Sequence, residues 1–180
     1  FAILPLFVVQ ELHGAESQVG LIMGAFAIAA VLTRPFSGQM VSIWSRKSGL
    51  SLGTLIYCLA PALYTLAGSV PVMLGLRFFH GIGIAIYTTA SSVFVADLSP
   101  PARRGEAMGY YGMALNLSMT IGPALGAYLV GSVGFINLFW FSSALALASF
   151  LLTQFIHEPK RTPPPNHTTA ERPPLFSRSA

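Results

Sequence analysis

Residues 74–97, LGLRFFHGIGIAIYTTASSVFVAD, form an apolar stretch that contains one arginine, Arg77, and ends in Asp97. The stretch is long enough to cross a bilayer as a helix. At 100° per residue Arg77, His80, Thr88, Ser91 and Ser92 fall within an arc of about 120°. A charge near the centre of a membrane helix costs about 3 kcal/mol or more, so it usually faces a bundle interior or a water-filled cavity. We therefore predict a membrane helix with one side lining a pathway; the alternative is that Arg77 extends to the membrane surface.

The composition is that of an integral membrane protein. Of the 180 residues 53% are hydrophobic and only 9% are charged, whereas soluble domains carry about 25% charged residues. Apolar runs near residues 17–42, 49–69, 71–96, 106–131 and 135–156 each predict a spanning helix. Residues 1–9 cover about half of a bilayer, so we expect a truncated first span and a fragment of a longer protein.

The whole pattern predicts an all-α membrane protein in two parts. Residues 1–156 are expected to form a six-helix transmembrane bundle, in which the span at 49–69 gives support only. Residues 157–180, rich in Pro, are expected to form a cytoplasmic linker or tail.

The connections between predicted spans carry basic residues on one side of the membrane only. The connections on that side hold Arg46, Lys47, Arg103, Arg104, Lys160 and Arg161. The opposite connections hold no Lys or Arg, and the first of them carries Glu11 and Glu16. The positive-inside rule then places the start and the end of the six-span chain on the cytoplasmic side. We expect the membrane to be the cell (inner) membrane.

Two predicted spans share a spacing of Gly and Pro. Gly24, Pro35 and Gly38 in the second span are spaced like Gly112, Pro123 and Gly126 in the fifth. The two spans run in opposite directions, so the match predicts an inverted 3+3 repeat.

Three motifs carry a resemblance to a known family. Arg77-x-x-His80-Gly81-x-Gly83 resembles the fourth-helix motif of proton-coupled carriers in the major facilitator superfamily. The loop from Gly38 to Lys47 resembles the cytoplasmic signature of that family, although Ser42 stands where the family has an aspartate. Gly122-Pro123-x-x-Gly126 resembles the core of the fifth-helix antiporter motif, which is typical of the drug-efflux branch.

The resemblance implies the N-terminal half of a twelve-helix carrier that exchanges protons for a small amphipathic solute by alternating access. Its partners would be membrane lipid, protons, the solute and a C-terminal six-helix half. The expected substrate or proton pathway contains Arg77, His80, Thr88, Ser91 and Asn116. The expected cytoplasmic gate contains Gly38, Ser42, Arg46, Lys47, Asp97 and Arg103, and in the family the acid at Asp97 pairs with the arginine at Arg46. Helix packing would use Gly81, Gly83, Gly112, Gly122, Pro123 and Gly126.

Other classes of function find no support in the sequence. It holds no Ser/His/Asp set, no carboxylate pair and no nucleotide-binding glycine motif, so we expect no enzyme and no cofactor. Its single cysteine, Cys58, suggests no metal site, and the scattered basic residues do not predict nucleic-acid binding. Two alternatives stay open, namely a nutrient uptake symporter and a truncated membrane protein that packs with a partner without transporting.

Overall fold

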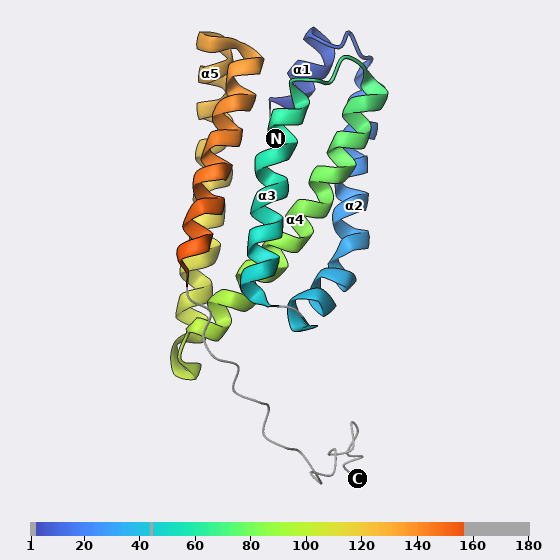
Figure 1. Ribbon diagram of the computed structural model, residues 1–180. Coiled ribbons are helices and arrows are strands. Elements are labelled where there is room, and N and C mark those ends of the chain that lie inside the picture. Colours follow the sequence, from blue (N-terminus) through green and yellow to red (C-terminus); the bar gives the residue numbers. More distant parts are fainter. Residues whose placement is uncertain (1–2, 44, 157–180) are drawn as a thin grey trace, which may run out of the picture.

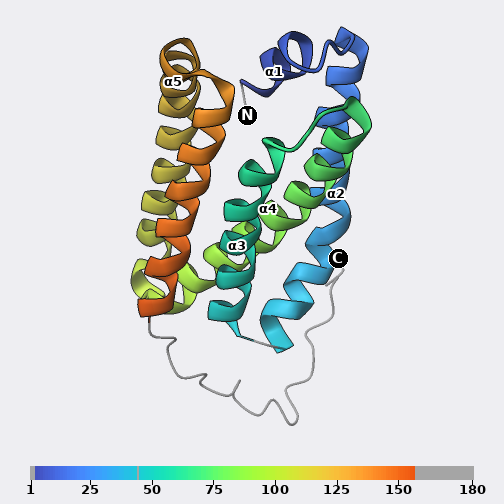
Figure 2. The same cartoon turned by 45° about the horizontal axis from the view of Figure 1, so that its top comes forward.

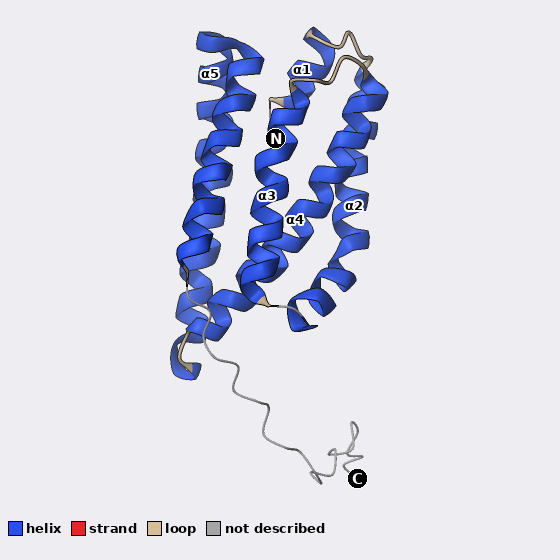
Figure 3. Ribbon diagram, in the orientation of Figure 1, coloured by secondary structure: helices blue, strands red, loops and turns tan. Residues whose placement is uncertain are grey.

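A computed structural model describes residues 3–43 and 45–156, and for Ser42 it describes the backbone alone. The described part consists of helices and connecting loops, without a strand (Figures 1 and 3). The helices are α1 (Leu4–Gln10), α2 (Glu16–Ile43), α3 (Arg46–Tyr64), α4 (Val70–Leu98) and α5 (Arg104–Phe155), with a 3₁₀ turn η1 (Pro101–Arg103) before α5. The expected tail at 157–180 lies outside the described residues.

α5 is a hairpin of two helical arms. The chain reverses at Gly134, whose φ of 80° and ψ of 173° favour a residue without a Cβ. Figures 1 and 2 show the two arms, residues 104–133 and 135–155, running in opposite directions. These arms agree with the predicted fifth and sixth spans.

Three helical segments are long and apolar enough to cross a membrane: Glu16–Val41, Val70–Leu98 and Pro101–Phe155, the last of which includes the reversal at Gly134. α3 is not among them, because it begins with the charged Arg46 and Lys47 and ends at Tyr64. The third span was predicted to end near residue 69, and this was wrong because α3 ends at Tyr64. The amides of Thr65 and Leu66 bond back to the carbonyls of Ala62 and Leu63 and tighten the chain into a turn. Apolar residues continue through this turn, so hydropathy alone does not detect it.

α4 lies at the centre of the bundle and packs against both α2 and α3 (Figure 2). Two glycines of α4 permit these close contacts. A Cβ added at Gly81 would lie 2.8 Å from the Cβ of Ala29 on α2, and one added at Gly83 would lie 2.8 Å from the Cβ of Ile56 on α3. Residues two apart on a helix point about 200° apart, so the pair serves opposite neighbours.

The bundle has a basic end, which carries Arg46, Lys47, Arg103 and Arg104, and an opposite end, at which α1 stops and α5 reverses. One buried apolar cluster lies toward the end opposite the basic one and includes Phe7, Met73 and Phe139. A smaller cluster, Val41, Leu50, Ala90 and Phe94, lies toward the basic end.

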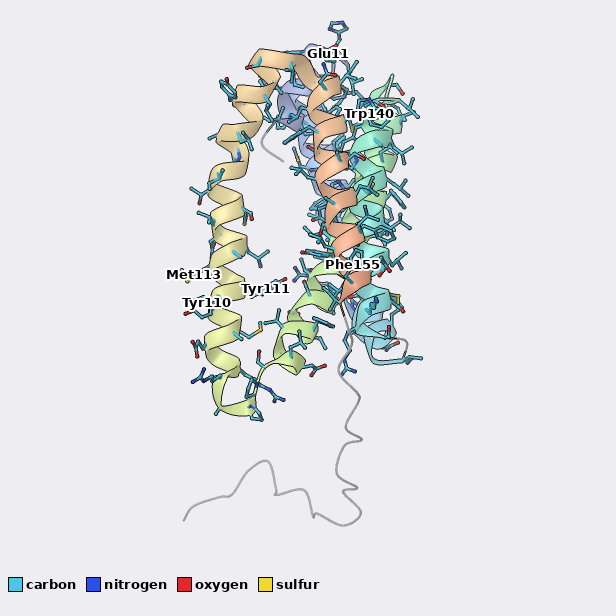
Figure 4. The ribbon with its side chains drawn as sticks, turned by 60° about the vertical axis from the view of Figure 1, so that its left-hand side comes forward. Glu11, Tyr110, Tyr111, Met113, Trp140 and Phe155 are labelled. Carbon is cyan, nitrogen blue, oxygen red and sulfur yellow. The ribbon has the colours of Figure 1, made fainter. Side chains whose placement is uncertain are left out.

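The first arm of α5 is exposed along nearly its whole length. Met113, Met119 and Tyr128 are exposed by 67%, 76% and 71%, and Gly126 is the buried residue of this arm. Figure 4 shows the arm standing apart from the other helices, with Tyr110 and Met113 labelled on it. Such apolar side chains need lipid or another protein segment around them.

Candidate functional site

Arg77 is buried inside the bundle, with 1% of its surface exposed. Its Nη1 donates a hydrogen bond to the Tyr64 hydroxyl at 3.4 Å, and its Nη2 lies 3.1 Å from the sulfur of Met23. Its guanidinium carbon stands 4.5 Å from the ring centroid of Phe26, in the geometry of a cation–π contact. The interior position predicted for Arg77 is therefore confirmed, and the alternative of a side chain reaching the membrane surface was wrong.

His80 lies one turn further along α4 and is 6% exposed. Its Nδ1 is 2.7 Å from the Tyr64 hydroxyl. Because that hydroxyl accepts a hydrogen bond from Arg77, its own proton can be donated to Nδ1 of His80. The imidazole also makes edge contacts with the rings of Phe26 and Tyr57, at centroid distances of 5.6 and 4.7 Å. Arg77, Tyr64 and His80 thus form one buried polar chain.

Sequence reasoning missed Tyr64. The predicted span at 49–69 was expected to give support only, yet its tyrosine joins the two polar residues of α4. A tyrosine in an otherwise apolar span was the available signal, because a buried hydroxyl usually finds a partner. The pairing itself depends on how α3 crosses α4, which the sequence does not reveal.

A cavity of about 300 Å³ adjoins this polar chain. Arg77, His80, Tyr57 and Tyr64 line it, and the rest of the lining is largely apolar and comes mainly from α1 and α5. Gly122, Pro123 and Gly126 belong to that lining. The fourth-helix and fifth-helix motifs, far apart in sequence, therefore meet at one cavity, which we call the Arg77 cavity.

Three predicted pathway residues lie outside the lining of the Arg77 cavity. The hydroxyl of Thr88 donates to the carbonyl of Ile84 within its own helix at 2.7 Å. Ser91 bonds to the hydroxyl of Tyr111 at 2.7 Å and so links α4 to the first arm of α5. Asn116 is exposed on that arm, and its amide donates to the carbonyl of Gly112.

The glycines expected to pack helices fall into two groups. Gly81, Gly83 and Gly126 have a neighbour within 3 Å of an added Cβ, which for Gly126 is Ile3. An added Cβ would meet nothing within 4 Å at Gly112 and Gly122. The same is true of Gly38, which was expected in the gate.

The expected ion pair at the basic end is formed. An Nη of Arg46 lies 2.6 Å from a carboxylate oxygen of Asp97. Arg46 is the first residue of α3, where the positive end of the helix dipole disfavours a cation. Asp97 is next to the last residue of α4, where the negative end of the helix dipole disfavours an anion. Pairing offsets both effects and ties α3 to α4.

The other residues of the expected gate lie at the same end. The Nζ of Lys47 donates to the carbonyl of Gln154 at 2.7 Å, which ties α3 to the second arm of α5. Arg103 is exposed, and the side chain of Ser42 lies outside the described residues.

The described residues do not bring together three His, Cys, Asp or Glu side chains that could hold a metal ion.

These features define an all-helical membrane protein with a polar chain buried beside an interior cavity. The sequence model of the Major Facilitator Superfamily matches residues 1–179, so the chain belongs to this family of transporters and not to an enzyme family. The chain is 32% identical to multidrug resistance protein 2 of Bacillus subtilis over 154 residues, which cover 86% of this chain and 38% of that protein.

Two other relatives are also resistance proteins. Identity is 27% with multidrug resistance protein 1 of Bacillus subtilis, over 87% of this chain and 40% of the relative. It is 23% with the quinolone resistance protein NorA of Staphylococcus aureus, over 89% of this chain and 41% of the relative. The chain thus resembles the drug-efflux branch and spans about 40% of the length of these relatives.

Proposed function

We propose that this chain is the N-terminal half of a proton-coupled efflux transporter for a small amphipathic solute. The observation that carries the proposal is the Arg77 cavity, where the buried polar chain of α3 and α4 meets Gly122 and Pro123 of α5. The names of the relatives, which are multidrug and quinolone resistance proteins, support efflux.

In this proposal the cavity is one side of a solute pathway. Tyr64 and His80 offer a hydroxyl and an imidazole that can pass a proton, and Arg77 supplies a fixed positive charge beside them. The apolar part of the lining, including Phe139 and Leu145, suits the apolar body of an amphipathic solute. Thr88, Ser91 and Asn116 would lie on other parts of the pathway.

We further propose that the bundle is a 3+3 inverted repeat and that a second six-helix half completes the carrier. The matched Gly and Pro positions of α2 and the first arm of α5 support the repeat. The exposed first arm and the open glycines Gly38, Gly112 and Gly122 support a further packing partner. The four basic residues at one end support a cytoplasmic location for that end, and there Arg46, Asp97, Lys47, Arg103, Gly38 and Ser42 would form the gate.

The test is gradient-driven movement of an amphipathic dye, ethidium, by the full-length protein in proteoliposomes. Replacement of Arg77 by alanine should lower the rate at least tenfold while the amount of inserted protein is unchanged, because removing one buried charge makes insertion easier. Arg104→Ala, which removes an exposed charge at the start of α5, is the matched control and should stay within about twofold.

Each alternative predicts a different result. Full gradient-driven activity in Arg77→Ala would contradict the assigned role of the polar chain. Accumulation of solute in the direction of the proton gradient would identify an uptake symporter. A full-length protein that inserts but moves no solute under either gradient would support a non-transporting partner protein.

A further inference from the structure

A second cavity, of about 460 Å³, lies at the end of the bundle opposite the basic one. It is bounded by the end of α1, the loop between α3 and α4, and the reversal of α5. Figure 4 labels Glu11 at this end, where α1 stops and the arms of α5 join. The residues that matter for its chemistry are Phe7, Glu11, Thr65, Gly68, Phe135 and Asn137, and we call it the Glu11 cavity.

The side chains of the Glu11 cavity present hydrogen-bond acceptors. Glu11 contributes a carboxylate. The amide nitrogen of Asn137 uses one of its two N–H donors on the carbonyl of Val133 at 2.8 Å, and its oxygen can accept a hydrogen bond from a ligand. The hydroxyl of Thr65 uses its proton to donate to the carbonyl of Ala62 at 2.6 Å and keeps its lone pairs. A ligand that donates hydrogen bonds or carries positive charge therefore matches this lining.

Charge favours the same ligand. Glu11 is the one formally charged residue among the described residues that line the cavity, whereas Arg77 lines the other cavity. Helices α1, α3 and the first arm of α5 end here, while α4 and the second arm begin here. The opposite helix dipoles largely cancel, so the carboxylate determines the local potential.

The walls also suit an apolar body. Phe7 and Phe135 both line the cavity and pack edge to face with centroids 5.5 Å apart. Aromatic rings attract quaternary ammonium groups through their quadrupole. An inorganic metal ion is disfavoured, because the described residues hold no cluster of three metal-ligating side chains.

We propose that the Glu11 cavity binds monovalent organic cations that carry an apolar group. This site is separate from the Arg77 cavity and does not depend on whether the protein transports. Its ligand is recognised by one carboxylate, two aromatic rings and the oxygens of Thr65 and Asn137.

The first experiment measures the charge preference of the cavity. Gly68→Cys places a reporter thiol in the lining, where an added Cβ meets nothing within 4 Å. The full-length protein, with Cys58→Ser and its other native cysteines replaced, is held in lipid nanodiscs that leave both faces accessible. The reporter thiol is treated separately with the cationic trimethylammonioethyl methanethiosulfonate and the anionic sulfonatoethyl methanethiosulfonate. The rate with the cation is divided by the rate with the anion, and this ratio is divided by the same ratio for a free thiol in solution.

The corrected ratio should exceed one. It should fall about fourfold in Glu11→Gln, because a nearby unit charge in water changes the concentration of each ion by roughly twofold, in opposite directions. Glu16→Gln is the matched control. Glu16 is an exposed carboxylate in the same region but not in the lining, so this change should alter the ratio less than twofold. An unchanged ratio in Glu11→Gln, or an equal fall in both variants, would overturn the proposal.

The second experiment measures binding itself. Benzyltrimethylammonium should slow the reaction of the reporter thiol with uncharged methyl methanethiosulfonate in a saturable way, and Glu11→Gln should weaken this protection at least threefold. Neopentylbenzene, its neutral isostere, should protect at least threefold more weakly at equal concentration. Equal protection by the two compounds would show an apolar pocket without charge recognition. No protection by either compound would show that the cavity does not bind such cations. Either result would overturn the proposal.

Discussion

Gly81 offers a direct test of how α4 crosses α2. A Cβ at this position would lie 2.8 Å from the Cβ of Ala29 and closer still to the backbone carbonyl of Phe26. The carbonyl belongs to a helix and cannot move alone, so Gly81→Ala must push two helices apart. Overpacking of this kind costs about 1–3 kcal/mol, against a gain of about 1 kcal/mol from the better helix propensity of alanine.

Gly75→Ala is the matched control on the same helix, because an added Cβ there meets nothing within 4 Å. It should keep only the propensity gain, so the free energies of unfolding of the two variants should differ by the steric cost of about 1–3 kcal/mol. The measurement is unfolding of the full-length protein in mixed micelles with rising dodecyl sulfate, followed by helical circular dichroism.

The same substitution should also disturb the Arg77 cavity. Arg77 and His80 precede Gly81 by four and one residues on α4, so a shift of the helix moves both side chains away from Tyr64. We expect slower dye transport in Gly81→Ala than in Gly75→Ala. Equal unfolding midpoints for the two variants would refute the close crossing at Gly81.

Two further predictions concern single contacts. A double-mutant cycle with Arg46→Gln and Asp97→Asn should give a coupling energy of about 0.2–1 kcal/mol that weakens with salt, since both side chains are partly exposed; a coupling of zero at low salt would contradict the ion pair. Tyr64→Phe should lower the free energy of unfolding by about 1–3 kcal/mol because it removes a buried hydroxyl that bonds to His80. The exposed control Tyr110→Phe should change it by less than about 0.5 kcal/mol, and similar losses in both variants would count against the polar chain.

The sequence by itself was enough to predict much of the helical organisation. Hydropathy located the stretches that became α2, α4 and both arms of α5, because a bilayer demands about 20 consecutive apolar residues whatever the fold around them. The motif at Arg77 and His80 also predicted an interior arginine, since exposure of its charge to lipid is costly. Opposite charges near the ends of successive spans, together with the resemblance to the family, predicted the contact of Arg46 with Asp97.

Only the tertiary structure decided which residues share a site. Tyr64 joins Arg77 and His80 because α3 crosses α4 within contact distance, which Gly83 permits. The same packing leaves Thr88 and Asn116 bonded within their own helices and outside the Arg77 cavity. The Glu11 cavity likewise exists because α1, the loop after α3 and the reversal at Gly134 meet at one end. Periodicity describes one helix at a time, whereas a cavity depends on how several helices are placed around it.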